Sequence, residues 1–159
     1  MSAPLANYAN EIYLQGLGDV VPAFTTDTSR LEESARSVME PGPFWYVAGG
    51  AGSGATVRAN REAFDRWRLV PRMLRDATNR SLATTVLGTS IPAPVLLGPV
   101  GVQSIIHPDG ELATARAAAE VGLPMVMSTA SSYSIEDVAA ASGDGARWFQ
   151  LYWPNDPDV

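Results

Sequence analysis

Three short stretches of this sequence place polar or side-chain-free residues directly after runs of apolar residues. They are Gly98–Gly101 (Gly-Pro-Val-Gly), Ser128 with Thr129, and Gln150 with Tyr152. A carboxamide, a phenol and a serine hydroxyl together offer the donors and acceptors that hydrogen-bond the edge of a planar heterocycle. Glycines remove side chains, so a flat ring could lie against the backbone at the first stretch. The residue types therefore indicate a site for a planar, polar-edged ligand.

A second interpretation of the same residues needs no ligand. Tyr152 could be a half-buried core aromatic, Gln150 an ordinary hydrogen-bonded amide, and Gly98–Gly101 a tight turn between a strand and a helix. Each stretch by itself leaves both interpretations open. Polar or side-chain-free residues at the ends of three successive predicted strands favour the ligand.

Metal and acid–base chemistry have little support in the sequence. His107 is the only histidine and precedes Pro108 at the start of a predicted helix, where a structural role is commoner than catalysis. We interpret Asp109 and Glu111 as first-turn acids that complement the helix dipole. Without cysteine or a second histidine, the usual nitrogen or sulfur metal site cannot be built.

Parallel strands are predicted to position the three stretches. The pattern predicts buried strands at 94–98, 124–128 and 147–152, separated by helices at 109–121 and 134–141. Gly122 ends the first helix, and Ser134 with Asp137 has the form of a capping box, with Tyr133 placed to contact Val138. This alternation predicts an α/β fold with a parallel sheet, in which ligands bind at the carboxyl ends of the strands.

The residues before the first strand are predicted to be mainly helical and to end in a hairpin. We leave residues 1–28 irregular and predict helices at 30–39, from Pro43 through 47, and at 55–64, an extended segment at 67–72 and a β-hairpin at 84–91 that turns near Gly88. The glycine-rich tract at 49–54 lacks the Lys-Ser/Thr ending of a phosphate loop. A flexible joint or a close backbone contact is the better interpretation of that tract.

Composition limits the class of protein. The 159 residues are 46% hydrophobic and 18% charged, carry a net charge of −6 and include no cysteine. These values predict a globular chain without disulfides, and the acidic balance argues against a nucleic-acid surface. No apolar run approaches the roughly 20 residues that cross a bilayer, and residues 1–10 have no signal-peptide pattern. We expect a soluble cytoplasmic protein.

Six segments, in one collinear order, resemble the FMN-dependent α-hydroxy acid oxidoreductases. They are residues 46–51 (Tyr-Val-Ala-Gly-Gly-Ala), 58–64 (Arg-Ala-Asn-Arg-Glu-Ala-Phe), 71–74 (Pro-Arg-Met-Leu), 98–102 (Gly-Pro-Val-Gly-Val), 107–111 (His-Pro-Asp-Gly-Glu) and 149–152 (Phe-Gln-Leu-Tyr). Together with Asn7-Tyr8 and Asn10 to Tyr13, the forms at 46 and 98 look most like the lactate 2-monooxygenase branch. Val100 and Gly101 stand where relatives carry Thr and Ala.

The resemblance implies a (β/α)8 TIM barrel that binds FMN at the carboxyl face of its strands. Residues 93–159 would form the first three β/α units, and residues 1–92 the preceding helical segment and a hairpin at the bottom of the barrel. The implied site residues are Pro99, Val100 and Gly101 beside the flavin's reactive edge, Ser128 and Gln150 on its ring, Tyr46 on the substrate carboxylate, and Tyr152 on the substrate hydroxyl or flavin.

The resemblance also implies an activity. It is the oxidation of an L-α-hydroxy acid, lactate first, by FMN and O2, and in the lactate 2-monooxygenase type the products are acetate, carbon dioxide and water. A plain oxidase or dehydrogenase that releases the keto acid is one alternative. A non-catalytic half-barrel or interaction module is another. The family also implies a homo-oligomer, a tetramer or octamer.

Part of the family's catalytic machinery has no counterpart in this chain. The catalytic His, the substrate-clamping Arg residues, the flavin-facing Lys and the phosphate site belong to later strands of the barrel, and His107 does not match the catalytic His motif. We therefore expect an amino-terminal half, inactive alone, that is truncated or pairs with a carboxyl-terminal partner chain.

Overall fold

The computed structural model describes residues 8–24, 26–76, 78–79 and 81–155. The chain divides into two compact units, Phe24–Arg80 and the combination of Met1–Ala23 with Ser81–Val159. All the described strands lie in the second of these units. The predicted boundary between residues 92 and 93 stays a prediction. No helix among the described residues is long and apolar enough to span a bilayer.

The Phe24–Arg80 unit is helical, as predicted, although the helix predicted to start at Pro43 starts at Pro41. A 3-10 turn, η1 (Thr28–Arg30), leads into α2 (Leu31–Val38), and α3 (Pro41–Ala48) and α4 (Ala55–Phe64) follow. Proline in the first turn suits α3 because its missing N–H would have no helical partner there. Phe44 on α3 is buried, and the guanidinium of Arg36 on α2 lies 5.3 Å from its ring centroid. The segment predicted as extended, 67–72, forms no strand.

The amino-terminal stretch departs from the prediction. Residues 8–16, expected to be irregular, form helix α1 (Tyr8–Gly16). Its apolar residues follow no sustained helical period, so the pattern did not reveal it. Asn7, which contributes to the family resemblance, lies outside the described residues.

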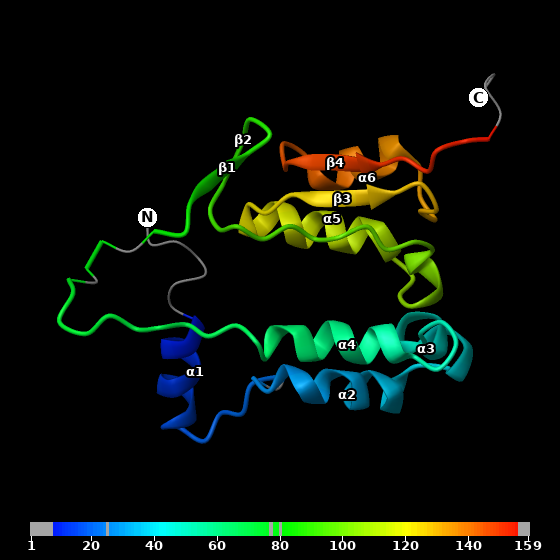
Figure 1. Cartoon of the computed structure of the whole chain (residues 1–159). Coiled ribbons are helices and arrows are strands. Elements are labelled where there is room, and N and C mark those ends of the chain that lie inside the picture. The colour runs from blue at the N-terminus through cyan, green and yellow to red at the C-terminus, as the bar shows by residue number, and fades with distance from the viewer. Residues whose placement is uncertain (1–7, 25, 77, 80, 156–159) are drawn as a thin grey trace. The chain divides into compact units, whose positions relative to one another are not determined.

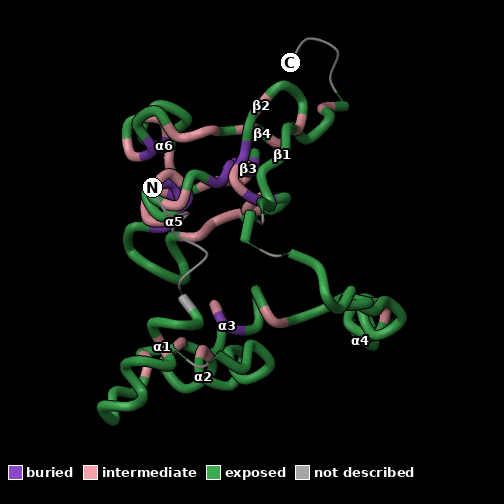
Figure 2. The backbone as a smooth tube through the Cα atoms, turned by 90° about the vertical axis from the view of Figure 1, so that its left-hand side faces the viewer, coloured by how far each residue is buried: buried purple, intermediate pink, exposed green. Residues whose placement is uncertain are grey.

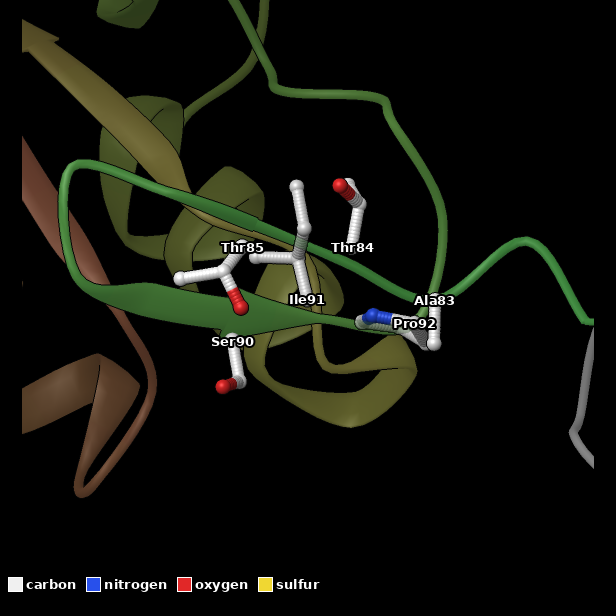
Figure 3. Close-up of a pocket in the computed structure, with 6 residues that line it drawn as sticks. All are labelled: Ala83, Thr84, Thr85, Ser90, Ile91 and Pro92. Carbon is white, nitrogen blue, oxygen red and sulfur yellow. The ribbon is translucent and has the colours of Figure 1, made fainter.

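The predicted hairpin is confirmed. β1 (Thr84–Val86) pairs antiparallel with β2 (Thr89–Ile91), and Leu87 and Gly88 both have positive φ in the two-residue turn. That conformation matches the twist of the flanking strands. A pocket of about 430 Å³ lies on the hairpin. Figure 3 shows the residues that line it, which are apolar or carry hydroxyl groups: Ala83, Thr84, Thr85, Ser90, Ile91 and Pro92.

Two parallel strands and two helices make the second half of the chain. α5 (Gly110–Val121) precedes β3 (Met125–Ser128), and α6 (Ile135–Ser142) precedes β4 (Arg147–Gln150). β3 and β4 pair in parallel, and Leu97 forms an isolated parallel bridge to Met125 on the other side of β3. Figure 1 shows α5 and α6 side by side on one face of the strands. Half of the capping box predicted for α6 is present: the Ser134 Oγ accepts the Asp137 N–H at 3.1 Å, while the Asp137 Oδ2 accepts the Ser134 hydroxyl at 2.8 Å and not the Ser134 N–H.

The core of this region lies between the strands and the two helices, where Figure 2 shows most of the buried backbone. It consists of Ala115, Ala118, Met125, Met127 and Val138. Alanines let α5 approach the sheet closely, and alternation along β3 sends both methionines to the helix side. Tyr133 packs against this cluster, as the predicted contact with Val138 requires.

Two strand predictions need correction. The segment 94–98 was predicted to be a fully buried strand, but it has only the Leu97 bridge, and Val95 is 49% exposed. Among the described residues, only β3 pairs with this segment, so its other edge has no strand to cover it. The third strand ends at Gln150 and not at Tyr152, because the Tyr152 N–H turns to a threonine hydroxyl instead of a ladder partner.

The end of α5 gives a test of backbone conformation. Gly122 caps the helix at φ 71°, and a Cβ there would meet only ordinary contacts, 3.6 Å from Pro92 Cγ. Gly122→Ala should therefore lower the free energy of unfolding by about 1 kcal/mol, the cost of a left-handed alanine. Urea denaturation followed by circular dichroism measures it. The matched control is Gly16→Ala at the end of α1, where φ is not left-handed; equal losses in both variants would contradict this account.

Candidate functional site

The register of β3 against β4 places two predicted ligand-binding side chains beside each other. Ser128 pairs with Gln150, and the Ser128 Oγ donates to the Gln150 Oε1 at 3.2 Å. Both side chains lie on the face away from α5 and α6, since the alternate residues Met127 and Phe149 face the helix side. Ser128 is buried and Gln150 is half-buried. This hydrogen bond leaves the Gln150 carboxamide N–H groups without a partner among the described residues.

Thr129 ties the two strand ends together. Its hydroxyl donates to the Gln150 carbonyl oxygen at 2.5 Å and accepts the Tyr152 N–H at 3.0 Å. The sequence placed Thr129 at the strand end but did not indicate this double role. A threonine directly after a buried strand, beside a second strand of the same length, is the signal that could have suggested it.

The backbone on either side of Gly98–Gly101 hydrogen-bonds to β3 and to the loop that follows β3. Val126 N–H donates to the Leu97 carbonyl at 2.9 Å, and Val102 N–H donates to the Ala130 carbonyl at 2.9 Å. Val102 itself is in the left-handed region, with φ 51° and ψ 43°. That conformation is strained for a β-branched residue. The loop from residue 98 to 103 therefore lies next to the loop that follows β3.

A buried carboxylate holds these two loops together. Glu111, in the first turn of α5, is 0% exposed, and its Oε1 accepts the Gln103 N–H and the Ser132 N–H, both at 3.0 Å. The preceding Gly110 is also buried, and a Cβ on it would lie 3.0 Å from the Ser104 nitrogen. Sequence reasoning missed Glu111 as a link between loops. Glu111 precedes the buried Ala115 by four residues, so both lie on the same face of α5, and this spacing could have indicated that Glu111 is buried.

The other predicted site residues are placed as follows. Pro99 and Val100 are exposed, and Gly101 is half-buried. Tyr152 lies two residues beyond β4 and is 60% exposed. Tyr46 lies on α3, in the other unit, and is 56% exposed, so its predicted place at this site stays a prediction.

His107 has a structural role, as expected. Its Nδ1 accepts the Asp109 N–H at 3.2 Å, and its carbonyl accepts the Gly110 N–H at 2.9 Å. Both contacts shape the turn that leads into α5. Among the described residues no group of three or more His, Cys, Asp or Glu side chains could hold a metal ion.

This edge therefore has the hydrogen-bonding groups that a planar, polar ligand would need. It combines carboxamide N–H groups that have no partner in the described part of the chain, a serine hydroxyl and exposed loop backbone within a hydrogen-bonded framework. An amide beside a hydroxyl can both donate to and accept from a heterocycle.

Comparison with known proteins identifies similar chains. Residues 35–159 match the family model described as FMN-dependent dehydrogenase. An FMN-dependent alpha-hydroxy acid dehydrogenase of Penicillium citrinum is 44% identical over 154 residues, which are 96% of this chain and 38% of that protein. An L-lactate oxidase of Alicycliphilus denitrificans is 48% identical over 134 residues, 84% of this chain and 36% of that protein.

The fold of the chain also matches solved structures. A mandelate oxidase variant bearing a C4a-OH-FMN adduct superposes with a TM-score of 0.74 at 43% identity, over 79% of this chain and 38% of that one. The chain thus spans a little over a third of the length of the relatives it matches.

Removing the Thr129 hydroxyl should loosen the end of β4. Thr129→Val keeps the side-chain shape but deletes both hydrogen bonds, so we expect about 1 kcal/mol less stability and faster amide exchange at Tyr152. Hydrogen exchange followed by NMR measures this site by site. Thr85→Val is the control, because Thr85 is an exposed strand residue with no side-chain hydrogen bond in the described structure. Unchanged exchange at Tyr152 in the Thr129 variant would refute the assigned role.

Proposed function

Because this chain belongs to the FMN-dependent dehydrogenase family, we propose that it supplies the amino-terminal part of a flavin enzyme that oxidises an α-hydroxy acid. The observation that carries the proposal is the Ser128–Gln150 pair, which leaves the Gln150 carboxamide N–H groups without a partner among the described residues. The pair lies at the strand ends, where the Val102 N–H of the preceding loop donates to the Ala130 carbonyl. Relatives named as oxidases and dehydrogenases of such acids support it.

The donor set fits FMN. An isoalloxazine ring carries carbonyl and ring-nitrogen acceptors and one N–H donor along its polar edge, which match a carboxamide and a hydroxyl. Gln150 and Ser128 would hold that edge, and the backbone of Pro99, Val100 and Gly101 would lie beside the ring. When bound, FMN supplies the two-electron acceptor for the oxidation. This chain's residues bind and orient the ring and keep its polar edge hydrogen-bonded.

The strands would be the first ones of a (β/α)8 barrel. Leu97, β3 and β4 lie in parallel order with both helices on one face, which is the arrangement of successive barrel units. In that fold, ligands bind at the carboxyl ends of the strands, where Ser128 and Gln150 lie. Tyr46 would bind the substrate carboxylate and Tyr152 the substrate hydroxyl or flavin. A carboxyl-terminal segment would supply the rest of the site, and homo-oligomer assembly is part of the same proposal.

We propose L-lactate as the substrate. The lactate-oxidising relative supports this choice. The Gly-Pro-Val-Gly form at 98–101 favours the lactate 2-monooxygenase outcome, in which the product is decarboxylated before release. Release of pyruvate with hydrogen peroxide, as an oxidase would do, is the second candidate, favoured by the oxidase name of that relative.

A visible absorption spectrum tests the flavin proposal. The chain is purified alone and together with the complementary carboxyl-terminal part of a lactate oxidase, and each sample is mixed with FMN and then with anaerobic L-lactate. We expect bleaching of the flavin only in the combined sample, because the described residues of the candidate edge offer binding groups and the proposal assigns the general base to the carboxyl-terminal part. D-lactate serves as the control for stereospecific reduction. Failure to bind FMN in the combined sample would favour a non-catalytic half-barrel.

Product analysis distinguishes the two outcomes in air. The monooxygenase proposal predicts acetate and carbon dioxide in equal amounts from L-lactate labelled at the carboxylate. Chromatography gives the amounts of acetate and pyruvate, and a peroxide assay gives the amount of hydrogen peroxide. Pyruvate with an equal amount of hydrogen peroxide would replace the monooxygenase proposal with the oxidase.

A further inference from the structure

Glu111 is a buried carboxylate whose hydrogen bonds leave its own helix. Its Oε1 accepts one N–H from Gln103, in the loop after the Leu97 strand segment, and one from Ser132, in the loop after β3. Oε2 is buried without a hydrogen-bond partner among the described atoms. Burying a carboxylate costs free energy unless hydrogen bonds replace those to water. The two loop N–H groups supply such bonds to Glu111, so its burial depends on both loops.

The carboxylate also holds a strained turn. Val102 is left-handed, and the two peptide N–H groups on either side of its α-carbon are both held: Val102 N–H by the Ala130 carbonyl and Gln103 N–H by Glu111. Strained backbone persists where its surroundings over-determine it. Glu111 thus supports the conformation in which the loop passes from Gly101 into η2 (Gln103–Ile105).

A helix-dipole role explains these contacts less well. An acid that complements the dipole lies exposed near the first N–H groups of its own helix. Glu111 is fully buried, and neither N–H that it accepts belongs to α5. Its bonds connect two loops whose spacing determines the shape of the candidate site.

We propose that Glu111 is a positioning residue for the flavin ring. It sets the spacing between loop 98–103 and loop 128–132, so that the ring meets the backbone beside Val100 and the Ser128–Gln150 pair at once. This inference rests on the proposed function. Glu111 touches neither the flavin nor the substrate and acts through the two loops.

The test compares FMN affinity with stability in the whole protein. Glu111→Ala should weaken FMN binding about tenfold or more, because it deletes two charge-assisted hydrogen bonds. Glu111→Gln keeps an acceptor oxygen and should bind FMN more tightly than the alanine variant. Quenching of FMN fluorescence gives the dissociation constant, and urea denaturation of the apoprotein gives the stability.

Two controls separate positioning from general destabilisation. Leu123→Ala removes the contacts of a buried residue that precedes β3, away from the loops that follow the strands, and lowers stability without altering the loop spacing. Glu120→Ala makes the same chemical change at an exposed position of α5. We expect both controls to bind FMN within about twofold of the wild-type value. Amide exchange at Gln103 and Ser132 should rise in Glu111→Ala and not in Leu123→Ala.

The outcomes separate this inference from the proposed function. Wild-type protein that binds no FMN overturns the proposed function, and the positioning role falls with it. Wild-type protein that binds FMN, with Glu111→Ala binding equally well, overturns the positioning role alone. An affinity loss in Leu123→Ala as large as that in Glu111→Ala also overturns it, since stability would then account for the effect.

Discussion

The parallel register of β3 against β4 determines where the polar groups of the candidate site lie. Burial of Met125 and Met127 against the helices sends the alternate residues of β3 to the opposite face. A slip of one residue would turn Gln150 toward the helix side and separate it from Ser128. Hydrophobic burial on one face of the sheet therefore selects the hydrogen-bond partners on the other face. The site is a consequence of the core.

Loops at the edge of this sheet are held by polar contacts inside the chain. Glu111 accepts two loop N–H groups, and Thr129 joins the end of β4 to the loop after β3. Gly110 allows the first loop to pass close to the start of α5, where a side chain would collide with backbone. The strain at Val102 is maintained by these contacts. An edge ordered in this way loses less conformational entropy on binding a rigid ring.

Local signals predicted much of this fold, while interactions distant in sequence explain the errors. Helix α4 and the hairpin β1–β2 follow from glycine boundaries and turn residues, and both are as predicted. The ends of the strands were less predictable, because the length of the 94–98 segment and of β4 depends on which neighbours pair with them. The local pattern predicts Glu111 as a dipole acid, because its burial depends on loops that no local pattern places. Ser128 and Gln150 were brought together as the strand alternation implied.

The described part of the candidate edge is rich in hydrogen-bonding groups and has no side chain placed to act as a general base. A general base must lie within hydrogen-bond reach of the proton that it removes. At the candidate edge the described polar side chains are an amide, hydroxyls and a phenol, which serve mainly as hydrogen-bond donors and acceptors. The Glu111 carboxylate already accepts two backbone N–H groups, and the Nδ1 of His107 accepts the Asp109 N–H. For the proposed oxidation, the described residues of this segment would therefore hold and orient the ring, and the proposal assigns the base to another segment.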